Sequence, residues 1–425
     1  MIRRMVLEWN MLPYGEKEDE IPLGIAARLM TVADASDIPD VLRYERHGLR
    51  AGSVVGIIVA PGVELEILPK IESLEQHGTQ ASDSIRSRLV HMLAVVLDMT
   101  VDGGDLAHMG TQDETLLEVV IRLFVRRLCE AVRRGLPRRY VEQADDLPAL
   151  RGRLDAIRQF SVLAVSPQKL ACRYDVLGCD TPLNQIMKAV VGRLLQLARA
   201  TDNQKRLREL ACIYADVSPV PVAALRWDAV TVDRTTARWT TLIELAHRLL
   251  HKPYQTTSNG ATQGFSLLFD MNVLFEKYIA YWLRVALEGT GLHVVVQGGG
   301  DYALYTPPDN RGVFLTIPDI LIKRDDKIVK IIDTKWKRLA RQENDPRQGV
   351  KQADIYQMMA YGRIYDCPHL MLLYPHHARL GGNLVRNLHR IARRAGPDVL
   401  EIATVNLSDN NTGLLHRLRQ LCDVA

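Results

Sequence analysis

Apolar residues recur along this chain in patterns that change from strand-like to helical and back. Near the amino terminus, residues 54–59 form a short apolar run. After a Pro-Gly turn, residues 63–68 alternate between apolar side chains and glutamate. Alternation with a period of two is typical of strands. We therefore predict a β-rich domain over residues 1–80.

The pattern becomes helical after residue 80. Apolar side chains recur at steps of three and four between residues 84 and 139, and again in residues 183–212 and 236–252. This spacing places them on one face of a helix. Pro219 and Pro221 mark a break between the later two segments. The sequence thus predicts a mostly helical connecting region over residues 81–254.

The last part of the chain mixes apolar strands with helices. Residues 316–339 contain two apolar segments joined by the polar turn 324–327, which predicts a strand pair. The surrounding periodicity predicts helices near residues 269–282, 354–361 and 413–421, and strands at 369–374 and 400–405. We expect a mixed α/β chain, with an α/β domain over residues 255–425.

Charged residues lie in the middle of this predicted strand pair. A turn centred on residue 326 places Asp319 opposite Asp333, and Lys335 shares their face. Charges within apolar strands are unfavourable unless they are paired or bind a metal. Mg²⁺ is bound by carboxylates, and an ammonium beside it can orient water at a phosphodiester. The set predicts a phosphodiesterase site; a structural salt bridge from Lys335 to either aspartate is the alternative.

Two predicted helices flank the strand pair and carry further polar residues. Gln357 and Tyr361 are four residues apart, so they share one helix face. Glu276 lies in the first turns of the helix that precedes the strand pair.

The order of these segments resembles the PD-(D/E)xK nuclease superfamily, nearest its RecB-like branch. The strings FDMNVLFEKY, IPDILI, DTKWK and DIYQMMAY are similar to the McrC family, the nuclease subunits of McrBC methylation-dependent restriction systems. The resemblance is strong over residues 265–375 and continues more loosely upstream, for example in LEILPKIE. It implies a restriction-endonuclease-like α/β domain over residues 255–425 and a Mg²⁺-dependent DNA endonuclease.

The same resemblance implies roles for the individual residues. The metal would be held by three carboxylates and a backbone carbonyl, one lysine would be catalytic, and a glutamine and a tyrosine would support the site or contact DNA. The three carboxylates are those of Asp319, Asp333 and Glu276, and the carbonyl is that of Thr334. The catalytic lysine is Lys335, and the supporting pair is Gln357 and Tyr361.

The resemblance also implies partners. McrC-family subunits act on double-stranded DNA together with McrB, an AAA+ GTPase ring that recognises methylcytosine and that the amino-terminal part of the subunit stimulates. This chain has no G-x-x-x-x-G-K-[ST] motif, so we expect the partner to bind the GTP. Residues 16–20 and 43–50 are candidate partner contacts, and ordinary surface loops are the equal alternative.

Charge adds little at the level of the whole chain, because a net charge of +4 is compatible with nucleic acid without arguing for it. Locally, Arg122, Arg126 and Arg133 form a basic stripe on a predicted helix, which could follow a DNA backbone. A solvated helix face is the alternative. The adjacent His376 and His377 lack the spacing of a zinc site, and we expect them at a polar rim near the DNA.

Other classes of protein are disfavoured by the sequence. The six cysteines show no C-x-x-C spacing, which argues against a zinc motif or a dense disulfide framework. No apolar run is long enough to span a membrane and no signal peptide is recognisable, so we expect a cytoplasmic protein.

Two other functions remain open. One is a non-cutting assembly or activator subunit of the NTPase ring that has kept the nuclease fold. The other is a stand-alone RecB-like DNA repair nuclease. The complete set Asp319, Asp333 and Lys335 argues against the first, and the long McrC-like stretch before the nuclease domain argues against the second.

Overall fold

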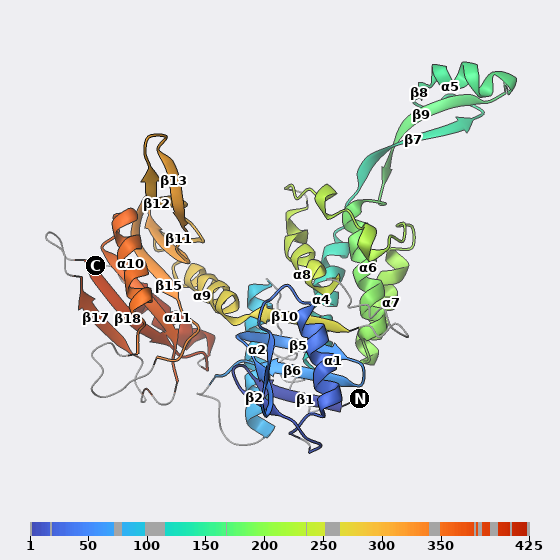
Figure 1. Ribbon diagram of the computed structural model, residues 1–425. Helices are drawn as coiled ribbons and strands as arrows, with labels where there is room; N and C mark the ends of the chain where they lie inside the picture. The colour runs from blue at the N-terminus through green and yellow to red at the C-terminus, as the bar shows by residue number, and fades with distance from the viewer. Residues whose placement is uncertain are drawn as a thin grey trace. The chain divides into compact units, whose positions relative to one another are not determined.

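The computed structural model falls into two compact units, one formed by Met1–Leu116 and Tyr254–Ala425 and the other by Leu117–Pro253 (Figure 1). The structure describes residues 2–17, 19–71, 79–97, 115–166, 168–234, 236–250, 264–339, 349–377, 380, 385–391, 398–408 and 410–422.

The amino-terminal part of the first unit contains two sheets and a helix. The larger sheet has the order β1 (Ile2–Leu7), β6 (Val63–Leu68), β5 (Val54–Ala60) and β10 (Phe265–Asp270), and every residue of β6 is buried. The smaller sheet comprises β2 (Met11–Pro13), β4 (Gly48–Ala51) and β3 (Leu42–Glu45).

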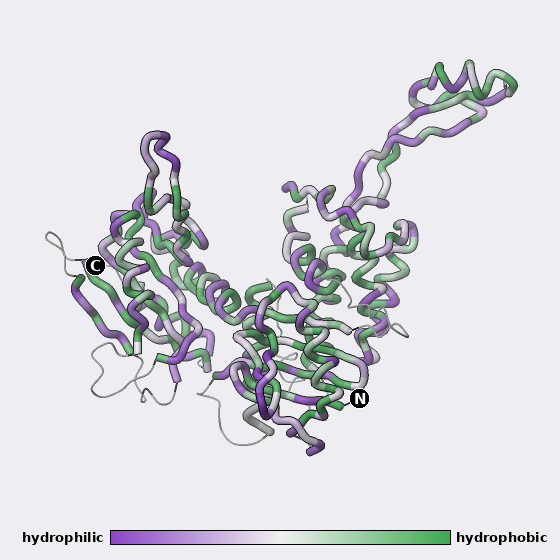
Figure 2. The backbone as a smooth tube through the Cα atoms, viewed as in Figure 1, coloured by the Kyte–Doolittle hydropathy of each residue, from purple (hydrophilic) through white to green (hydrophobic). Residues whose placement is uncertain are grey.

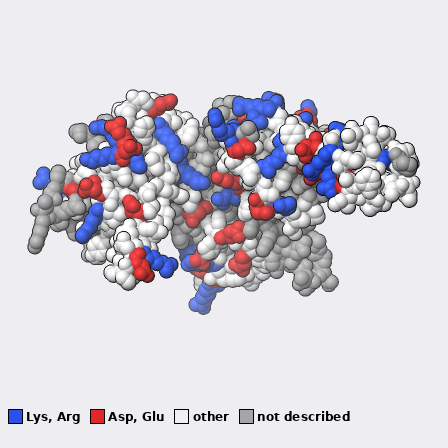
Figure 3. Space-filling model, turned by 90° about the horizontal axis from the view of Figure 1, so that it is seen from above, with Lys and Arg blue, Asp and Glu red and all other residues white. Residues whose placement is uncertain are grey.

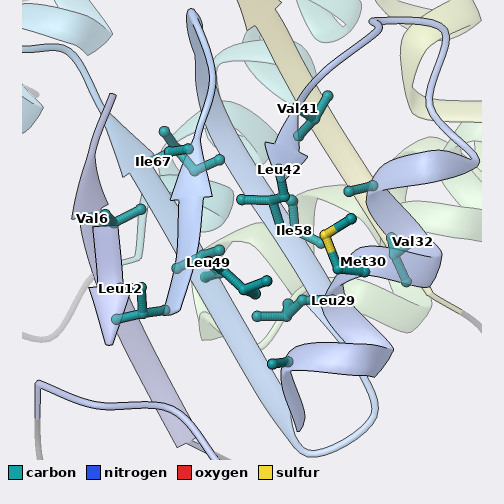
Figure 4. Close-up of a cluster of buried hydrophobic side chains, with 14 of the residues drawn as sticks. Val6, Leu12, Leu29, Met30, Val32, Val41, Leu42, Leu49, Ile58 and Ile67 are labelled. Carbon is teal, nitrogen blue, oxygen red and sulfur yellow. The ribbon is translucent and has the colours of Figure 1, made fainter. Parts of the chain in front are cut away.

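Helix α1 (Leu23–Asp34) packs against this region and closes an apolar core. Figure 4 shows Leu29, Met30 and Val32 of α1 near Leu49 and Ile58 of the two sheets. The burial of these side chains is the main force that stabilises this part of the unit. Residues 1–71 thus have the β-rich character that their alternation predicts, with one helix added.

The carboxy-terminal part of the first unit is built on a six-stranded mixed sheet. Its order is β11 (Leu292–Val296), β14 (Ile320–Arg324), β15 (Lys327–Thr334), β16 (His369–Pro375), β18 (Val399–Val405) and β17 (Arg386–Arg390). The pairs β15–β16 and β16–β18 are parallel, whereas the outer pairs are antiparallel. The central strands are nearly continuous apolar runs, as expected for strands covered on both faces.

Helices and a hairpin complete this part. Helix α9 (Met271–Ala286) packs against β11 and β15, α10 (Gln352–Ile364) against β15 and β16, and α11 (Asn411–Cys422) against α9 and β18. The hairpin of β12 (Asp301–Thr306) and β13 (Arg311–Thr316) leads directly towards β14. Helix α2 (Thr79–Val96) packs against α9 and β6.

The second unit combines a helical bundle with a projecting arm. The bundle contains α4 (Leu116–Arg133), α6 (Pro182–Leu197), α7 (Thr201–Ile213) and α8 (Thr240–Leu250), with 3₁₀ turns at Val222–Ala224, Trp227–Ala229 and Ala237–Trp239. We call residues 139–178 the arm. It consists of β7 (Arg139–Leu147), β8 (Arg153–Leu154), α5 (Ala156–Ser161), a 3₁₀ turn at Leu163–Val165 and β9 (Leu170–Gly178) (Figure 1).

The tip of the arm is apolar and exposed. Ile157, Phe160 and Val165 of α5 and the following turn are 85%, 79% and 88% exposed. The hydropathy colouring shows hydrophobic positions at this tip as well as in the buried strands (Figure 2). Lys, Arg, Asp and Glu gather nearer the base of the arm, whereas the tip is largely free of them on the face shown in Figure 3.

The predicted mixed α/β class is confirmed, but some details differ from the sequence analysis. Strand β10 pairs with β5 and therefore belongs to the amino-terminal sheet, not to the carboxy-terminal one. Residues 43–50 form a hairpin of β3 and β4, not a loop. The second unit contains the three-stranded sheet of the arm in addition to its helices.

The division into two units does not decide whether residues 1–80, 81–254 and 255–425 are three domains, so that partition remains a prediction. In the described ranges of the chain, no helix has the length and apolar composition needed to cross a bilayer.

Candidate active site

Two aspartates meet where β14 begins and β15 ends. Ile320 pairs with Ile332 and Leu321 with Ile331, so the antiparallel register brings Asp319, directly before β14, to the end of β15. The backbone N–H of Thr334 donates to Asp319 Oδ2 over 2.8 Å, and the Thr334 hydroxyl donates to the same atom over 3.0 Å. The register shifts by one residue between Ile322 and Lys323, and this bulge places Asp319 opposite Asp333 instead of Ile332.

Asp333 is the more deeply buried of the two aspartates. It lies in the middle of the sheet, beside Leu372 of β16, and is 1% exposed. The pKa of its carboxyl is raised to about 6, mainly by burial and next by the neighbouring Asp319, while Lys335 opposes the shift. Its Oδ1 atom has no hydrogen-bond partner among the residues that the structure describes.

Lys335 connects the aspartates to α10. Its ammonium lies 2.7 Å from Asp333 Oδ2 and donates to Gln357 Oε1 over 3.2 Å. Gln357 Nε2 donates to the Tyr361 hydroxyl over 2.9 Å, and that hydroxyl donates to the carbonyl of Ile317 over 3.5 Å. Burial alone would lower the pKa of Lys335, but the Asp333 carboxylate outweighs burial and raises it, so the side chain is a cation.

Glu276 reaches this site from α9. The helix begins at Met271 because the Asp270 side chain accepts hydrogen bonds from the backbone N–H groups of Asn272 and Val273. Glu276 directly follows the buried Phe275 in α9 and is itself 7% exposed. Burial raises the pKa of its carboxyl to about 7, and Asp319 and Asp333 add to the shift. Its Oε1 atom lacks a hydrogen-bond partner within the described ranges.

Two residues that the sequence analysis missed also shape the site. The Gln297 side chain forms a hydrogen bond with Glu276, and its backbone N–H donates to the Asp319 carbonyl over 2.8 Å. Gln297 has a φ of 46°, a left-handed conformation that three following glycines make easier to accommodate. A polar residue between an apolar strand and a glycine run is the signal that could have identified it.

Asp354 is the second missed residue. It is buried in the first turn of α10, and Lys337 Nζ lies 3.3 Å from its Oδ1 atom. Its charge acts on both Asp333 and Lys335. The Asp354 carboxylate thus increases the negative charge around the site, and its place in the string DIYQMMAY was the available signal.

The residues present fit a divalent cation. Asp319, Asp333 and Glu276 bring three carboxyl groups close enough to influence one another, and the Lys335 ammonium faces Asp333. Two of these carboxyl groups keep a buried oxygen without a hydrogen-bond partner in the described part of the chain. A cation would satisfy these atoms and lower the repulsion.

Among the described residues, no group of three or more His, Cys, Asp or Glu side chains is arranged to enclose a metal ion. This is compatible with Mg²⁺, which is usually held by one or two carboxylates together with water and substrate phosphate. The salt bridge that the sequence analysis kept as an alternative is present, but it uses only one of the Asp333 oxygens.

The arginines that were predicted to follow a DNA backbone lie on α4 in the second unit. Arg122 and Arg126 are half-buried on α4 in the second unit, and Arg126 pairs with Glu130 at 3.6 Å; only Arg133 of the three is exposed. These three arginines therefore do not form a continuous exposed stripe on the helix.

The two adjacent histidines are buried, not at a polar rim. The ring of His376 forms a hydrogen bond of 3.1 Å with the Thr404 hydroxyl, and that of His377 one of 2.9 Å with the Leu339 carbonyl. They follow directly after β16, and each ring binds a partner within the first unit.

Comparison with known proteins gives a family and two similar structures. The family model described as "McrBC 5-methylcytosine restriction system component" matches residues 49–375. A Thermococcus gammatolerans structure, a half-complex of McrB AAA+ hexamers with bound McrC, contains a chain with 20% identity and a TM-score of 0.63, covering 99% of this chain and 100% of that one.

A second structure supports the same likeness. In the cryo-EM structure of the Thermococcus gammatolerans McrBC complex, a chain with 25% identity and a TM-score of 0.50 covers 67% of this chain and 88% of its own length. Among curated proteins, no sequence matches.

Proposed function

Because the chain belongs to the McrBC 5-methylcytosine restriction system family, we propose that it is the subunit of such a system that cuts DNA. The reaction would be Mg²⁺-dependent hydrolysis of a phosphodiester bond. The observation that carries the proposal is the meeting of Asp319, Asp333 and Lys335 at one end of the β14–β15 pair, with buried carboxylate oxygens left unpaired.

The carboxylates would hold the metal. Asp319 and Asp333 are the first ligands, Glu276 supplies a third carboxyl group, and the Thr334 carbonyl completes the protein's share. A bound Mg²⁺ would polarise the phosphodiester and favour ionisation of an attacking water. The raised pKa values of Asp333 and Glu276 support this assignment, because a nearby dication would stabilise both carboxyl groups in their charged form.

Lys335 would act on the reacting phosphate. Its ammonium pairs with Asp333 in this structure; with a cation on that carboxylate it would be able to hold the attacking water or stabilise charge on the phosphate oxygens. Gln357 limits the positions of this ammonium, and Tyr361 in turn orients Gln357. These two residues would support the site, and an exposed neighbour of theirs, Tyr356, is available to the DNA backbone.

The partner in this proposal is an AAA+ ring of the McrB type that binds and hydrolyses GTP and recognises methylcytosine. The chain itself lacks a P-loop motif. The Thermococcus gammatolerans relative is bound to McrB AAA+ hexamers, which supports an assembly of the same kind here. We place one contact at the tip of the arm, because exposed Ile157, Phe160 and Val165 are unfavourable in water and suit a protein partner.

Two observations weigh against the alternatives. An activator that does not cut DNA would have no use for a buried, mutually repelling set of carboxyl groups, which destabilises the fold. A stand-alone repair nuclease has no evident use for the arm, whose apolar tip is exposed in the described chain. The experiment below separates the activator from our proposal, and the stand-alone nuclease is separated by whether cleavage requires the partner GTPase.

The proposed roles can be tested by measuring Mg²⁺ binding and DNA cleavage on the same variants. Asp333→Asn should lose both, because it removes a ligand; Lys335→Ala should bind Mg²⁺ at least as well as wild type, yet cut DNA at least 100-fold more slowly. Calorimetry and single-turnover cleavage are the two measurements. Normal cleavage by Lys335→Ala would contradict the catalytic role, and unchanged Mg²⁺ binding by Asp333→Asn would contradict the metal site.

A further inference from the structure

Glu8 is a buried carboxyl that the amino-terminal sheet holds in a fixed position. It follows β1, whose last residue Leu7 pairs with Leu68 of β6, and the Glu8 backbone N–H donates to the Leu68 carbonyl over 2.9 Å. Its side chain is enclosed, since the residue is 1% exposed, and the backbone N–H of Lys70 donates to its Oε1 atom over 2.9 Å.

The same carboxyl oxygen binds the residue that follows Lys335. The indole Nε1–H of Trp336 donates to Glu8 Oε1 over 2.7 Å, across 328 positions of sequence. Trp336 is 7% exposed, and its ring packs against that of Phe275 with centroids 5.3 Å apart. Phe275 directly precedes Glu276, so the indole lies beside the backbone of two residues of the candidate active site.

Lys335 needs such an anchor because it lies beyond the regular strand. Strand β15 ends at Thr334, and the backbone N–H of Lys335 donates to the Leu373 carbonyl over 2.9 Å. The next residue, Trp336, borders a cavity of about 560 Å³. Packing therefore does not enclose the indole on every side, and its hydrogen bond to Glu8 restricts rotation that would move the backbone of Lys335.

Fold stability alone does not explain a carboxyl at this position. The Oε2 atom of Glu8 is buried and has no hydrogen-bond partner in the described part of the chain. An unsatisfied buried polar atom destabilises a fold, whereas an apolar side chain of similar length would not. The carboxyl is thus better explained by what its other oxygen does, which is to accept from the Lys70 backbone and from the distant Trp336 indole.

We infer that Glu8 is a positioning residue for cleavage: by binding the Trp336 indole it fixes the backbone after Lys335 and so aligns the Lys335 ammonium. The inference rests on the proposed nuclease function. It also means that the amino-terminal sheet takes part in building the site.

The test compares Glu8→Met, which keeps the length of the side chain but removes the acceptor, with Glu8→Gln, which retains an oxygen acceptor. We expect Glu8→Met to lower the single-turnover cleavage rate at least tenfold with DNA affinity unchanged, and Glu8→Gln to stay within about threefold of wild type. Trp336→Phe should match Glu8→Met, and the double variant should be no slower than either. Glu64→Met, which removes a buried carboxyl from the same sheet, is the control and should cut like wild type.

Independent effects of the two substitutions, or a normal rate in Glu8→Met, would overturn the inference. A measurement independent of cleavage separates its failure from that of the nuclease proposal. Amide hydrogen exchange should accelerate in residues 335–337 of Glu8→Met but not of Glu8→Gln, while exchange in β5 and β6 stays unchanged. If wild type fails to cut, the nuclease proposal fails and this exchange result alone decides whether Glu8 positions Lys335.

Discussion

At the scale of single residues, the site concentrates negative charge in a buried place. Glu276 and Asp333 have pKa values raised to about 7 and about 6, chiefly by burial and then by neighbouring carboxylates. Without a cation, the folded chain therefore keeps both groups protonated to a higher pH than the unfolded chain, which ionises them near their ordinary pKa values of 4.5 and 3.8. The metal and the proton compete for the same oxygens.

This competition predicts how Mg²⁺ stabilises the protein at different pH values. A raised pKa in the folded state contributes stability that is complete below the unfolded pKa and is lost as pH rises through the folded pKa. The metal-free chain should thus lose stability as pH rises from about 4 to about 7, and Mg²⁺ should restore it. We expect the rise in melting temperature on adding Mg²⁺ to be larger at pH 8 than at pH 5.5.

Differential scanning fluorimetry with Mg²⁺ and with the chelator EDTA would measure this difference, and Asp333→Asn is its matched variant. The asparagine should remove most of the Mg²⁺ effect at pH 8. An equal Mg²⁺ shift at both pH values would contradict the placement of the metal on these carboxyl groups.

The sequence allowed some of these residues to be predicted and not others. The meeting of Asp319 with Asp333 followed from the two-residue period of strands and the position of one polar turn, and the structure has this arrangement. Gln297 and Asp354 could not be ranked above other polar residues, because their place depends on a left-handed turn and on the packing of α10. Whether the residues bind metal stays a prediction.

At the scale of elements, the arm is the feature that hydrophobic periodicity described least well. Strand β7 carries mostly polar residues, and in β9 polar and apolar residues alternate only over the short stretch 172–176. Ion pairs such as Arg158 with Asp146, at 2.9 Å, hold the tip in place of an apolar core. Surface pairs of this kind contribute little stability each and leave no periodic signal in sequence.

Substitutions at the tip of the arm should impair partner binding without impairing folding. Replacing exposed Ile157 and Phe160 by serine should weaken binding to the AAA+ ring at least tenfold, because apolar contact area is lost. Leu388→Ser, at a position that is 63% exposed on β17, is the control and should bind like wild type. Light scattering or sedimentation of the mixed proteins would measure the complex, and normal assembly by the double serine variant would contradict this role for the arm.

At the scale of the whole molecule, the predicted membership of the McrBC family is confirmed by the family model, and the mixed α/β class by the structure. The contacts that join distant parts of the first unit were beyond the sequence analysis. Strand β10 completes the amino-terminal sheet from residue 265 onward, and Trp336 binds Glu8. Neither contact repeats locally, so no periodicity could reveal it.

These distant contacts change the account of how the site is built. Helix α9 carries Glu276 and starts directly after β10, so the amino-terminal sheet fixes the origin of that helix. The same sheet anchors Trp336 beside Lys335. The amino-terminal sheet therefore supports both Glu276 and Lys335 of the candidate active site. The sequence analysis had assigned residues 1–80 to a separate domain.

The most direct test of the central claim is plasmid cleavage by the purified chain with its partner GTPase, GTP and Mg²⁺, on methylated and unmethylated DNA. Asp333→Ala is compared with wild type, and Asp326→Ala, in the exposed turn between the same two strands, is the control. We predict that wild type and Asp326→Ala cut methylated DNA and that Asp333→Ala does not. Cleavage by Asp333→Ala at the wild-type rate would contradict the assigned site, and GTP hydrolysis stimulated by a wild-type chain that cuts nothing would instead establish an activator.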